Sequence, residues 1–333
     1  MSRFWVLLLV YGLLGCGEKE MLISGKTMGS TYHIKVISYT SSQELREKIE
    51  KRLDGLNHCL SVYQKDSEIS RFNASKSSEK FYPSQDFKNV LTIGRQLFQF
   101  TQGAWDGTIH QLALLWGFTS DRKENQTLPK PEAIQTCLKS IGFNHIIINS
   151  DSSIQKKNDS ITLDLNSLAQ GYASDQIALL IKAEGIDNYL VEIGGEVVAS
   201  GHNLKGKPWR VGINTPFEDA PLDAVYKVVS LQNKALSTSG NYRNFFKIND
   251  KLYAHILDPK SGYPVENGVV SATVMADNCT FADGLATALV VMGVEKALAL
   301  VNQLDNIECL IIVKESDSNL KDYYSKGFKT EPF

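Results

Sequence analysis

The chain has 333 residues and a formal net charge of −2 at pH 7, and 43% of its residues are hydrophobic. This length is enough for one large domain, or two lobes, with a buried core, and the apolar content is ordinary for a globular protein. Basic residues do not exceed acidic ones, 35 against 37, so we expect no nucleic-acid partner.

The N-terminus has the pattern of a secretory signal. Arg3 precedes an apolar run from Phe4 to Leu14, which is too short to span a bilayer because a spanning helix needs roughly 20 residues. The next residues, Gly15 and Cys16, resemble the end of a bacterial lipobox, in which the cysteine carries the lipid. We therefore expect a lipoprotein signal peptide at 1–15, a tether at 16–24 and a lipid anchor on Cys16. This arrangement predicts a bacterial envelope protein that faces the periplasm or the outside. The alternative is an ordinary signal peptide with a chance cysteine.

The other four cysteines lie in apolar contexts, and their spacing matches no zinc pattern. They are Cys59, Cys137, Cys279 and Cys309. We expect small buried hydrophobic side chains rather than metal ligands or a disulfide framework.

Hydrophobic periodicity predicts alternating helices and strands in the first half of the chain. A Gly-flanked approach at 25–30 leads into a strand at 31–37, and Ser41 and Glu44 form a capping box for a helix that ends near Leu60. The segment 66–73 is expected to be a loop. Ser84 opens a second helix, and Gly103 stops it. The polar segment 119–131 is expected to be a surface loop, followed by a short helix from Pro131 to Ser140.

A motif at 164–173 joins two further predicted strands, 145–149 and 161–165, to a helix. Its residues are DLNSLAQGYA. A helix N-terminus carries unpaired N–H groups and a partial positive charge, so it favours phosphate. Gly171, in the first turns of the helix, costs about 1 kcal/mol relative to alanine, which indicates close packing against a ligand or a strand.

The segment 253–293 has the densest pattern in the chain. His255 precedes an Asp-Pro turn, a strand is predicted at 269–275, and the following helix carries Asp283 and Thr287. Four residues are about one helical turn, so this carboxylate and this hydroxyl share a face. Two hard oxygen ligands suit Mg²⁺, which usually takes further oxygens from phosphates. The alternative is a capped helix with a satisfied aspartate.

Eight segments in this order resemble the FAD:protein FMN transferase family, also called ApbE. They are GKTMGSTY, SVYQKDSEISRFN, GAWDGT, LDLNSLAQGYASD, EIGGEVVASG, STSGNYRNFF, AHILDPKSGYPV and FADGLATAL. The resemblance covers nearly all of the chain from about Gly25 to Phe328. It implies an α+β fold in one large domain at 25–333, related to the T-fold, with mixed or antiparallel sheets flanked by helices.

The resemblance also implies a Mg²⁺-dependent reaction. The family cleaves FAD, attaches the FMN half to a Thr or Ser hydroxyl of an acceptor protein, and releases AMP. A lipid-anchored member would act on a membrane partner, such as a subunit of a redox complex. Two alternatives remain open. One is a Mg²⁺-dependent FAD pyrophosphatase with water as the acceptor, and the other is a flavin-binding lipoprotein without turnover.

The family's functional positions fall on particular residues of this chain. The flavin-contacting positions fall on Met28, Tyr63, Ala104, Trp105, Asp106, Asp164, Gln170 and Leu257. The metal positions fall on Ser167, through its backbone carbonyl, and on Asp283 and Thr287. Two departures are notable, because Gln170 stands where the family often has lysine, and a further metal position falls on Ala286, which has no side-chain oxygen.

His255 is the candidate catalytic base, because its ordinary pKa suits proton transfer near neutral pH. The alternative role is structural, with His255 ordering the turn at Asp258 and Pro259.

Overall fold

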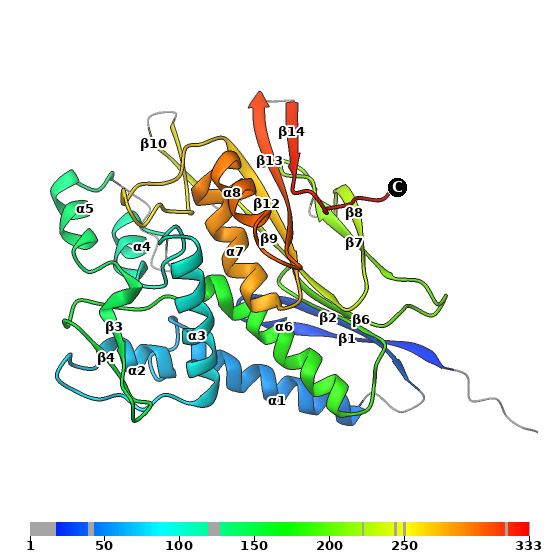
Figure 1. Cartoon of the computed structure of the whole chain (residues 1–333). Helices are drawn as coiled ribbons and strands as arrows, with labels where there is room; N and C mark the ends of the chain where they lie inside the picture. The colour runs from blue at the N-terminus through cyan, green and yellow to red at the C-terminus, as the bar shows by residue number, and fades with distance from the viewer. Residues whose placement is uncertain are drawn as a thin grey trace, which may run out of the picture.

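An eight-stranded antiparallel sheet forms the centre of the molecule (Figure 1). The computed structural model describes residues 18–38, 43–118, 127–221, 223–242, 245–248, 251–316 and 319–332. The strand order is β1-β2-β5-β6-β9-β12-β13-β14, and every neighbouring pair is antiparallel. The strands are β1 (Lys19–Thr27), β2 (Ser30–Ser38), β5 (Tyr189–Ile193), β6 (Glu196–Ser200), β9 (Lys234–Gly240), β12 (Val269–Ala276), β13 (Glu308–Ser316) and β14 (Asn319–Tyr324).

Helices cover one face of this sheet, and a two-stranded hairpin covers part of the other (Figure 1). The helices are α1 (Gln43–Leu60), α2 (Glu68–Ala74), α3 (Gln85–Phe100), α4 (His110–Trp116), α5 (Pro131–Leu138), α6 (Asn166–Ala183), α7 (Cys279–Met292) and α8 (Val294–Val301). The hairpin on the other face is β7 (Trp209–Asn214) with β8 (Val225–Leu231). Two smaller pairs are β3 (Ile146–Ile148) with β4 (Ile154–Lys156), and β10 (Phe245–Ile248) with β11 (Lys251–Ala254).

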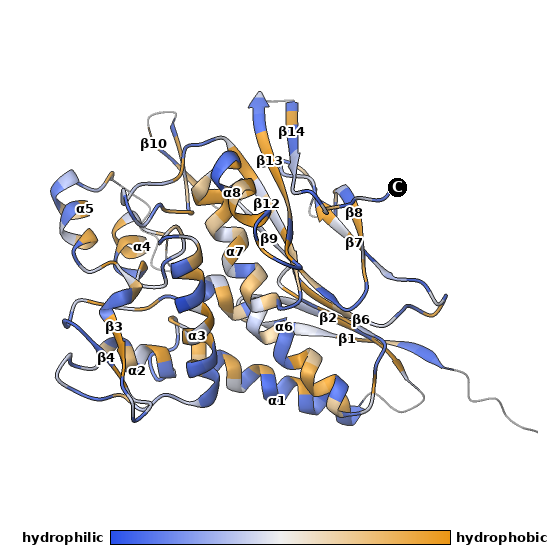
Figure 2. Cartoon of the chain, in the orientation of Figure 1, coloured by the Kyte–Doolittle hydropathy of each residue, from blue (hydrophilic) through white to orange (hydrophobic). Residues whose placement is uncertain are grey.

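The main hydrophobic core lies between the helices and the sheet. Helix α7 is buried along most of its length and is largely apolar in Figure 2, whereas α1 carries both hydrophilic and hydrophobic segments. A second core fills the space under the β7–β8 hairpin, and a third joins α4 and α5 to Leu257. The large core fixes α6 and α7 against the sheet, and these two helices carry most of the candidate site.

The structure confirms most of the predicted elements. Helices begin after Ser84 and at Pro131 as expected, and Ser84 Oγ caps α3 by accepting the N–H of Phe87 at 3.3 Å. The strand at 31–37, the helix after Asp164 and the strand at 269–275 are also present. The expected capping box at Ser41 and most of the loop at 119–131 lie outside the described residues, as do the signal peptide and Cys16.

Two predictions in the first half of the chain are wrong. The segment expected to be a loop contains α2, which Ser67 caps through the N–H of Ser70. The segment 161–165 is not a strand, because its backbone pairs with isolated groups rather than with another strand. Leu163 exchanges two hydrogen bonds with the side chain of Asn73, and the N–H of Asp164 donates to the carbonyl of Gly107.

The two ends of the sheet also differ from expectation. Residues 19–24, expected to belong to a tether, form most of β1, which pairs along its whole length with β2. The alternation of the sequence also predicts a last strand at 323–328, but in the structure β14 spans Asn319–Tyr324 and ends four residues earlier. Both β1 and β14 are edge strands of the central sheet. The bounds of an edge strand depend on pairing with its neighbour as well as on its own residues, so local sequence predicts them poorly.

The cysteines behave as small hydrophobic side chains. Cys59, Cys279 and Cys309 are buried, Cys137 is partly buried, and all four are free. Among the residues that the structure describes, no helix is both long and apolar enough to cross a bilayer.

Candidate active site

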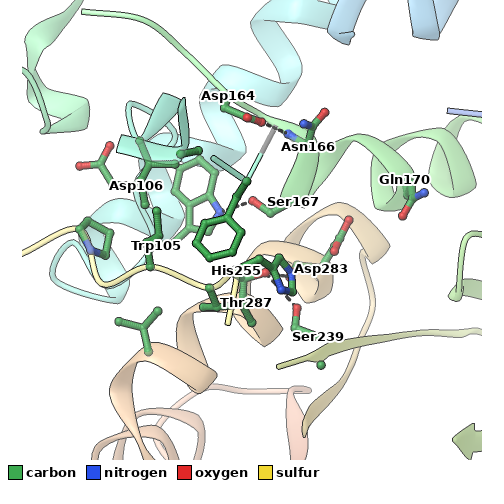
Figure 3. Close-up of a pocket in the computed structure, with 18 of the residues that line it drawn as sticks. Trp105, Asp106, Asp164, Asn166, Ser167, Gln170, Ser239, His255, Asp283 and Thr287 are labelled. Atoms are coloured by element: carbon green, nitrogen blue, oxygen red, sulfur yellow. Dashed lines mark hydrogen bonds between the residues drawn. The ribbon is translucent and has the colours of Figure 1, made fainter. Parts of the chain in front are cut away.

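A cavity of about 420 Å³ opens where α6, α7, β9 and the turn after β11 meet. The sequence-predicted residues that line it are Tyr63, Ala104, Trp105, Asp106, Asp164, Ser167, Gln170, His255, Leu257, Asp283 and Thr287. Figure 3 shows many of them facing one space although they come from distant parts of the chain. The fold therefore assembles nearly the whole predicted set in one place.

Met28 is the exception. It lies in the β1–β2 turn with a left-handed φ of 48° and lines a neighbouring cavity of about 320 Å³. Tyr63 and Asn166 line both cavities. A ligand that contacts Met28 as well as the first cavity must therefore pass Tyr63.

Two buried carboxylates, Asp283 and Glu196, form the acidic centre of the first cavity. Asp283 Oδ2 accepts a hydrogen bond from the N–H of Gly171 at 3.0 Å, and Ser237 Oγ lies 3.4 Å from Asp283 Oδ1. The same hydroxyl lies 3.3 Å from Glu196 Oε1, so its single proton serves two acids. Within the described part of the chain, Glu196 Oε2 has no hydrogen-bond partner.

Burial strongly disfavours the charged forms of both acids. It raises the pKa of Asp283 to about 8. The pKa of Glu196 is raised well above its ordinary value, first by burial and then by the charge of Asp283. Two buried carboxylates that share one donor, with one oxygen unpaired, are stabilised by a cation between or beside them. These residues therefore fit a hard divalent metal.

Glu196 was missed by the reading of the sequence. It lies in the EIGGEVVASG motif and is the first residue of β6, directly after a Gly-Gly turn. The signal that could have found it is the alternation of β6, which places Glu196 on the same face as Val198, a residue that packs against the main core. Only the packing of α6 and α7 over β6 shows that it is enclosed.

Hydroxyl and carbonyl oxygens complete the polar lining. Thr287 Oγ1 lies 2.9 Å from Ser239 Oγ, one helical turn beyond Asp283. In an α-helix the N–H of Gly171 would donate to the carbonyl of Ser167. Here the N–H of Gly171 also donates to Asp283. The carbonyl oxygen of Ser167 can therefore accept a further bond. Among the described residues no three His, Cys, Asp or Glu side chains cluster as metal ligands. A metal here would rely on hydroxyl, carbonyl and substrate oxygens, as Mg²⁺ does.

Ala286, the position without a side-chain oxygen, is completely buried in the core and does not line the cavity. Its methyl group packs among the apolar side chains between α7 and the sheet. Any further metal ligand must therefore come from the backbone, from water or from another residue of the cavity.

Aromatic side chains form the opposite wall. Trp105 is buried, its indole N–H donates to Ser167 Oγ at 2.9 Å, and its ring lies 5.7 Å from that of Phe143. Tyr63 is 58% exposed and lines the first cavity where it adjoins the cavity that Met28 lines. A flat apolar ring system can contact both, each aromatic contact adding about 0.5–1.5 kcal/mol beyond burial.

Two of the predicted aspartates build the walls of the cavity. The carboxylate of Asp106 accepts the N–H and hydroxyl of Thr108 at 2.8 and 2.6 Å and the N–H of Phe143 at 3.2 Å. Figure 3 shows it turned away from the acidic centre. Asp164 accepts the N–H of Asn166 at 2.9 Å and lies 3.5 Å from the ring of His110. The first closes the turn that carries Trp105, and the second holds the start of α6.

His255 lies next to Thr287 and Asp283 in the cavity (Figure 3). The turn that follows it is ordered by its own backbone, since the N–H of Asp258 donates to the carbonyl of Tyr263 and the N–H of Val265 to that of Ile256. Leu257 pairs with Pro264 in the same turn. The turn is therefore held by these bonds, and the imidazole is directed toward the face of α7 that carries Asp283 and Thr287 (Figure 3).

Two glycines allow the close approach of the elements around Gln170. A Cβ on Gly171 would lie 2.7 Å from the carbonyl oxygen of Cys279 and 2.8 Å from the Cβ of Asp283, so α6 and α7 touch here. Gly194 has a left-handed φ of 68°, and a Cβ there would lie 2.4 Å from Gln170 Nε2. The close packing that Gly171 predicted is against a helix.

The fold and the cavity define an α+β protein with an acidic, aromatic-walled site whose lining fits a hard cation and a flat ring system. Comparison with known proteins makes the assignment specific. The profile of the ApbE family matches residues 28–311. The chain belongs to the ApbE family.

Similar proteins extend over nearly the whole chain. The FAD:protein FMN transferase of Vibrio cholerae is 38% identical over 334 residues, which cover 98% of each chain. That of Escherichia coli K12 is 35% identical over 332 residues, 95% of this chain and 93% of the other. The solved structure of the flavin transferase ApbE from Vibrio cholerae superposes with a TM-score of 0.83 and 37% identity, covering 93% of this chain and 98% of that one.

Proposed function

We propose that this protein transfers FMN from FAD to a hydroxyl group of an acceptor protein with the help of Mg²⁺. The chain is an enzyme of the FAD:protein FMN transferase class, in agreement with its full-length relatives. The observation that carries the mechanism is the buried pair Asp283 and Glu196, whose unpaired oxygen and raised pKa values call for a cation beside the aromatic wall.

In the reaction one P–O bond of the FAD diphosphate breaks, AMP leaves, and a new P–O bond forms to the acceptor oxygen. Asp283, Thr287 and the carbonyl of Ser167 would hold Mg²⁺, with Glu196 beside it. When bound, Mg²⁺ would neutralise charge on the diphosphate, which is worth several kcal/mol in such reactions.

The protein's own groups bind the flavin and move the proton. Trp105 and Tyr63 would flank the flavin ring, and the first turn of α6 offers N–H groups to the phosphates. His255 would take the proton of the acceptor hydroxyl, a contribution of about 10²–10⁴-fold in such reactions.

The test is to incubate the purified chain with FAD, Mg²⁺ and a Thr-containing acceptor, and to measure AMP by chromatography and the acceptor by mass spectrometry. We expect AMP together with an FMN-sized mass increase on the acceptor. Asp283→Ala is expected to remove both products while circular dichroism shows an intact fold. AMP and free FMN without an adduct would identify a pyrophosphatase, and intact FAD bound without AMP would identify a binding protein.

We further propose that the protein is a lipoprotein of the bacterial envelope, anchored through Cys16. The support is the apolar run before Gly15 and Cys16, which is a feature of the sequence alone. An anchored enzyme would meet acceptor hydroxyls on membrane proteins, such as subunits of redox complexes.

Expression of the full chain in a bacterium tests the anchor. We expect the protein in the membrane fraction, with labelled palmitate incorporated, and Cys16→Ser is expected to abolish labelling. Labelling that persists in Cys16→Ser would exclude this site of attachment.

A further inference from the structure

The N-terminal strand begins at one end of the central sheet. The first residue of β1, Lys19, pairs with Ser38, the last residue of β2. Because the chain advances at most about 3.6 Å per residue, the Cα atoms of Cys16 and Lys19 lie no more than about 11 Å apart. The proposed lipid anchor would therefore hold this end of the sheet close to the membrane surface. Figure 1 shows β1 beginning on the side of the molecule away from α4 and α5.

The loop 201–208, which joins β6 to β7, leaves the sheet at the same end. Residues of β1, β2, β5 and β6 pair in one row across the sheet, which runs Met21, Val36, Tyr189 and Ser200. Neighbouring strands are about 4.8 Å apart, so the loop starts about 14 Å to the side of β1. The N–H of His202 donates to Asn188 Oδ1 at 3.0 Å, which ties the loop to this end.

Asn203 holds the backbone of the loop in a compact turn. Its Oδ1 accepts the N–H groups of Lys205 and Lys207 at 2.9 and 3.3 Å, and its Nδ2 donates to the carbonyl of Pro208 at 3.1 Å. Its own N–H donates to the carbonyl of Lys207 at 2.9 Å, and its carbonyl accepts the N–H of Gly206 at 2.9 Å. The backbone of the tip is therefore held in place, while its side chains are exposed.

The tip of this loop is apolar and positively charged. Leu204 is 52% exposed. Lys205 and Lys207 are exposed, and neither forms an ion pair with another residue that the structure describes. The exposed acid Asp187 belongs to the same end of the sheet, but its backbone adjoins Gly201 at the base of the loop. The tip therefore presents positive charge around an apolar side chain.

We propose that the loop 201–208 contacts an anionic lipid surface beside the lipid anchor. Leu204 enters the headgroup region, and the lysines meet lipid phosphates. An apolar side chain with basic neighbours suits a membrane interface, and each lysine near an anionic surface strengthens attachment about fivefold. The proposal rests on the proposed anchor at Cys16, because one leucine and two lysines bind a bilayer weakly by themselves.

This contact would orient the active site. Strand β6 runs from Glu196, in the acidic centre of the cavity, to Ser200, which leads into the loop. Met28, just beyond the other end of β1, lines the cavity next to the active site. The 9 residues of β1 span about 30 Å. With the anchor and the loop on lipid, the active site lies at the end of the sheet that is remote from the membrane.

The test uses the full chain, expressed in a bacterium with labelled palmitate and reconstituted into phosphatidylcholine vesicles that contain phosphatidylglycerol. Leu204→Trp adds a tryptophan at the tip of the loop, and brominated lipid quenches tryptophan emission on contact. The matched control is Leu252→Trp, at an exposed position of β11. After subtraction of the emission of the unaltered chain, we expect quenching of the emission that Leu204→Trp adds, and none for Leu252→Trp.

The role of charge is tested by adding Lys205→Glu and Lys207→Glu to Leu204→Trp. We expect this change to lower the equilibrium constant for the contact about 25-fold, fivefold for each lysine, and raised salt to weaken quenching because exposed charges are screened. The control is Lys139→Glu with Lys157→Glu, an equal change of charge on the side of α5 and β4 (Figure 1), which should keep the quenching. AMP release from FAD should be equal in all variants, because none of these residues lines the active site.

Three results would count against the proposal. A chain that carries palmitate but shows no quenching in Leu204→Trp overturns the lipid contact alone, and the loop would then be free to meet an acidic protein surface. Equal quenching with and without the two lysines overturns the role of charge. A chain that incorporates no palmitate overturns the proposed anchor, and the contact with it.

Discussion

At the scale of single residues, the site depends on two acids that the protein keeps out of water. Asp283 and Glu196 share the hydroxyl of Ser237, and no described residue donates a hydrogen bond to Glu196 Oε2. Burying an unpaired charge is costly, so the metal-free site is destabilised when both acids are ionised. A bound cation would offset this free-energy cost.

The raised pKa of Asp283 predicts how the stability of the metal-free protein depends on pH. The folded state holds a proton up to about pH 8, whereas an unfolded aspartate releases it near pH 4. The folded state therefore binds more protons between these values, and stability falls as pH rises from about 4 to 8.

Thermal unfolding in EDTA across this pH range measures the effect. We expect the decrease in melting temperature to be smaller in Asp283→Asn, and Mg²⁺ to raise the melting temperature of the unaltered chain more at pH 8 than at pH 5. A melting temperature that rises with pH equally in both proteins would contradict the assignment.

Removing the charge of Glu196 separates its effect on the stability of the metal-free protein from its effect on Mg²⁺ binding. Glu196→Gln is expected to stabilise the metal-free protein, because no unpaired buried charge remains, and to weaken Mg²⁺ binding about 10–100-fold. Calorimetric titration with Mg²⁺ and thermal unfolding in EDTA measure both. Glu295→Gln, at an exposed position of α8, is the control and should change neither. Unaltered Mg²⁺ affinity in Glu196→Gln would separate this residue from the metal site.

At the scale of elements, the site is the contact between α6 and α7. Asp175 on α6 accepts the N–H groups of Cys279 and Thr280 at 3.0 and 2.9 Å, so one helix caps the start of the other. One turn earlier on α6, Gly171 meets Asp283. These two contacts fix the position of α7 along α6, and therefore the positions of Asp283 and Thr287 relative to Ser167.

A pair of glycine substitutions tests this contact. Gly171→Ala is expected to destabilise the protein by about 1–3 kcal/mol, because its Cβ would push α6 away from α7. Gly55→Ala, in the middle of α1 with no atom within 4 Å of the added Cβ, is expected to stabilise it by up to about 1 kcal/mol. Urea unfolding measures both. Equal changes in the two variants would show that Gly171 is not a packing constraint.

At the scale of the whole molecule, the site lies between a large core and a small peripheral unit. Strands β5, β6 and β9 belong to the central sheet, whereas β10 and β11 form a separate pair of four residues each. That pair is joined to α4 by aromatic contacts, with Phe246 and Tyr253 stacked at 5.4 Å and Trp116 5.8 Å from Tyr253. It continues directly into His255.

This difference predicts uneven local stability. Amide hydrogen exchange in 251–254 is expected to be at least tenfold faster than in 189–193, because a two-stranded pair has few buried hydrogen bonds. FAD with Mg²⁺ should slow exchange in the segment around His255. Mass spectrometry of peptic fragments measures it, and uniform protection across both segments would contradict the prediction.

The sequence alone determined much of the helical framework and most of the members of the site. Periodicity located α1 and α3, and the spacing of Asp283 and Thr287 placed two oxygens on one helical face, because both signals depend only on local geometry. The eight motifs indicated the family through residues whose chemistry is visible in the one-letter code.

Only the tertiary structure decided which groups are buried together. Glu196 became part of the site because α6 and α7 cover β6, and residues 19–24 became strand β1 because β2 lies beside them. Residues 161–165 are not a strand because Asn73 and Gly107 take their hydrogen bonds. Burial and strand pairing depend on partners distant in the chain, and local sequence does not name those partners.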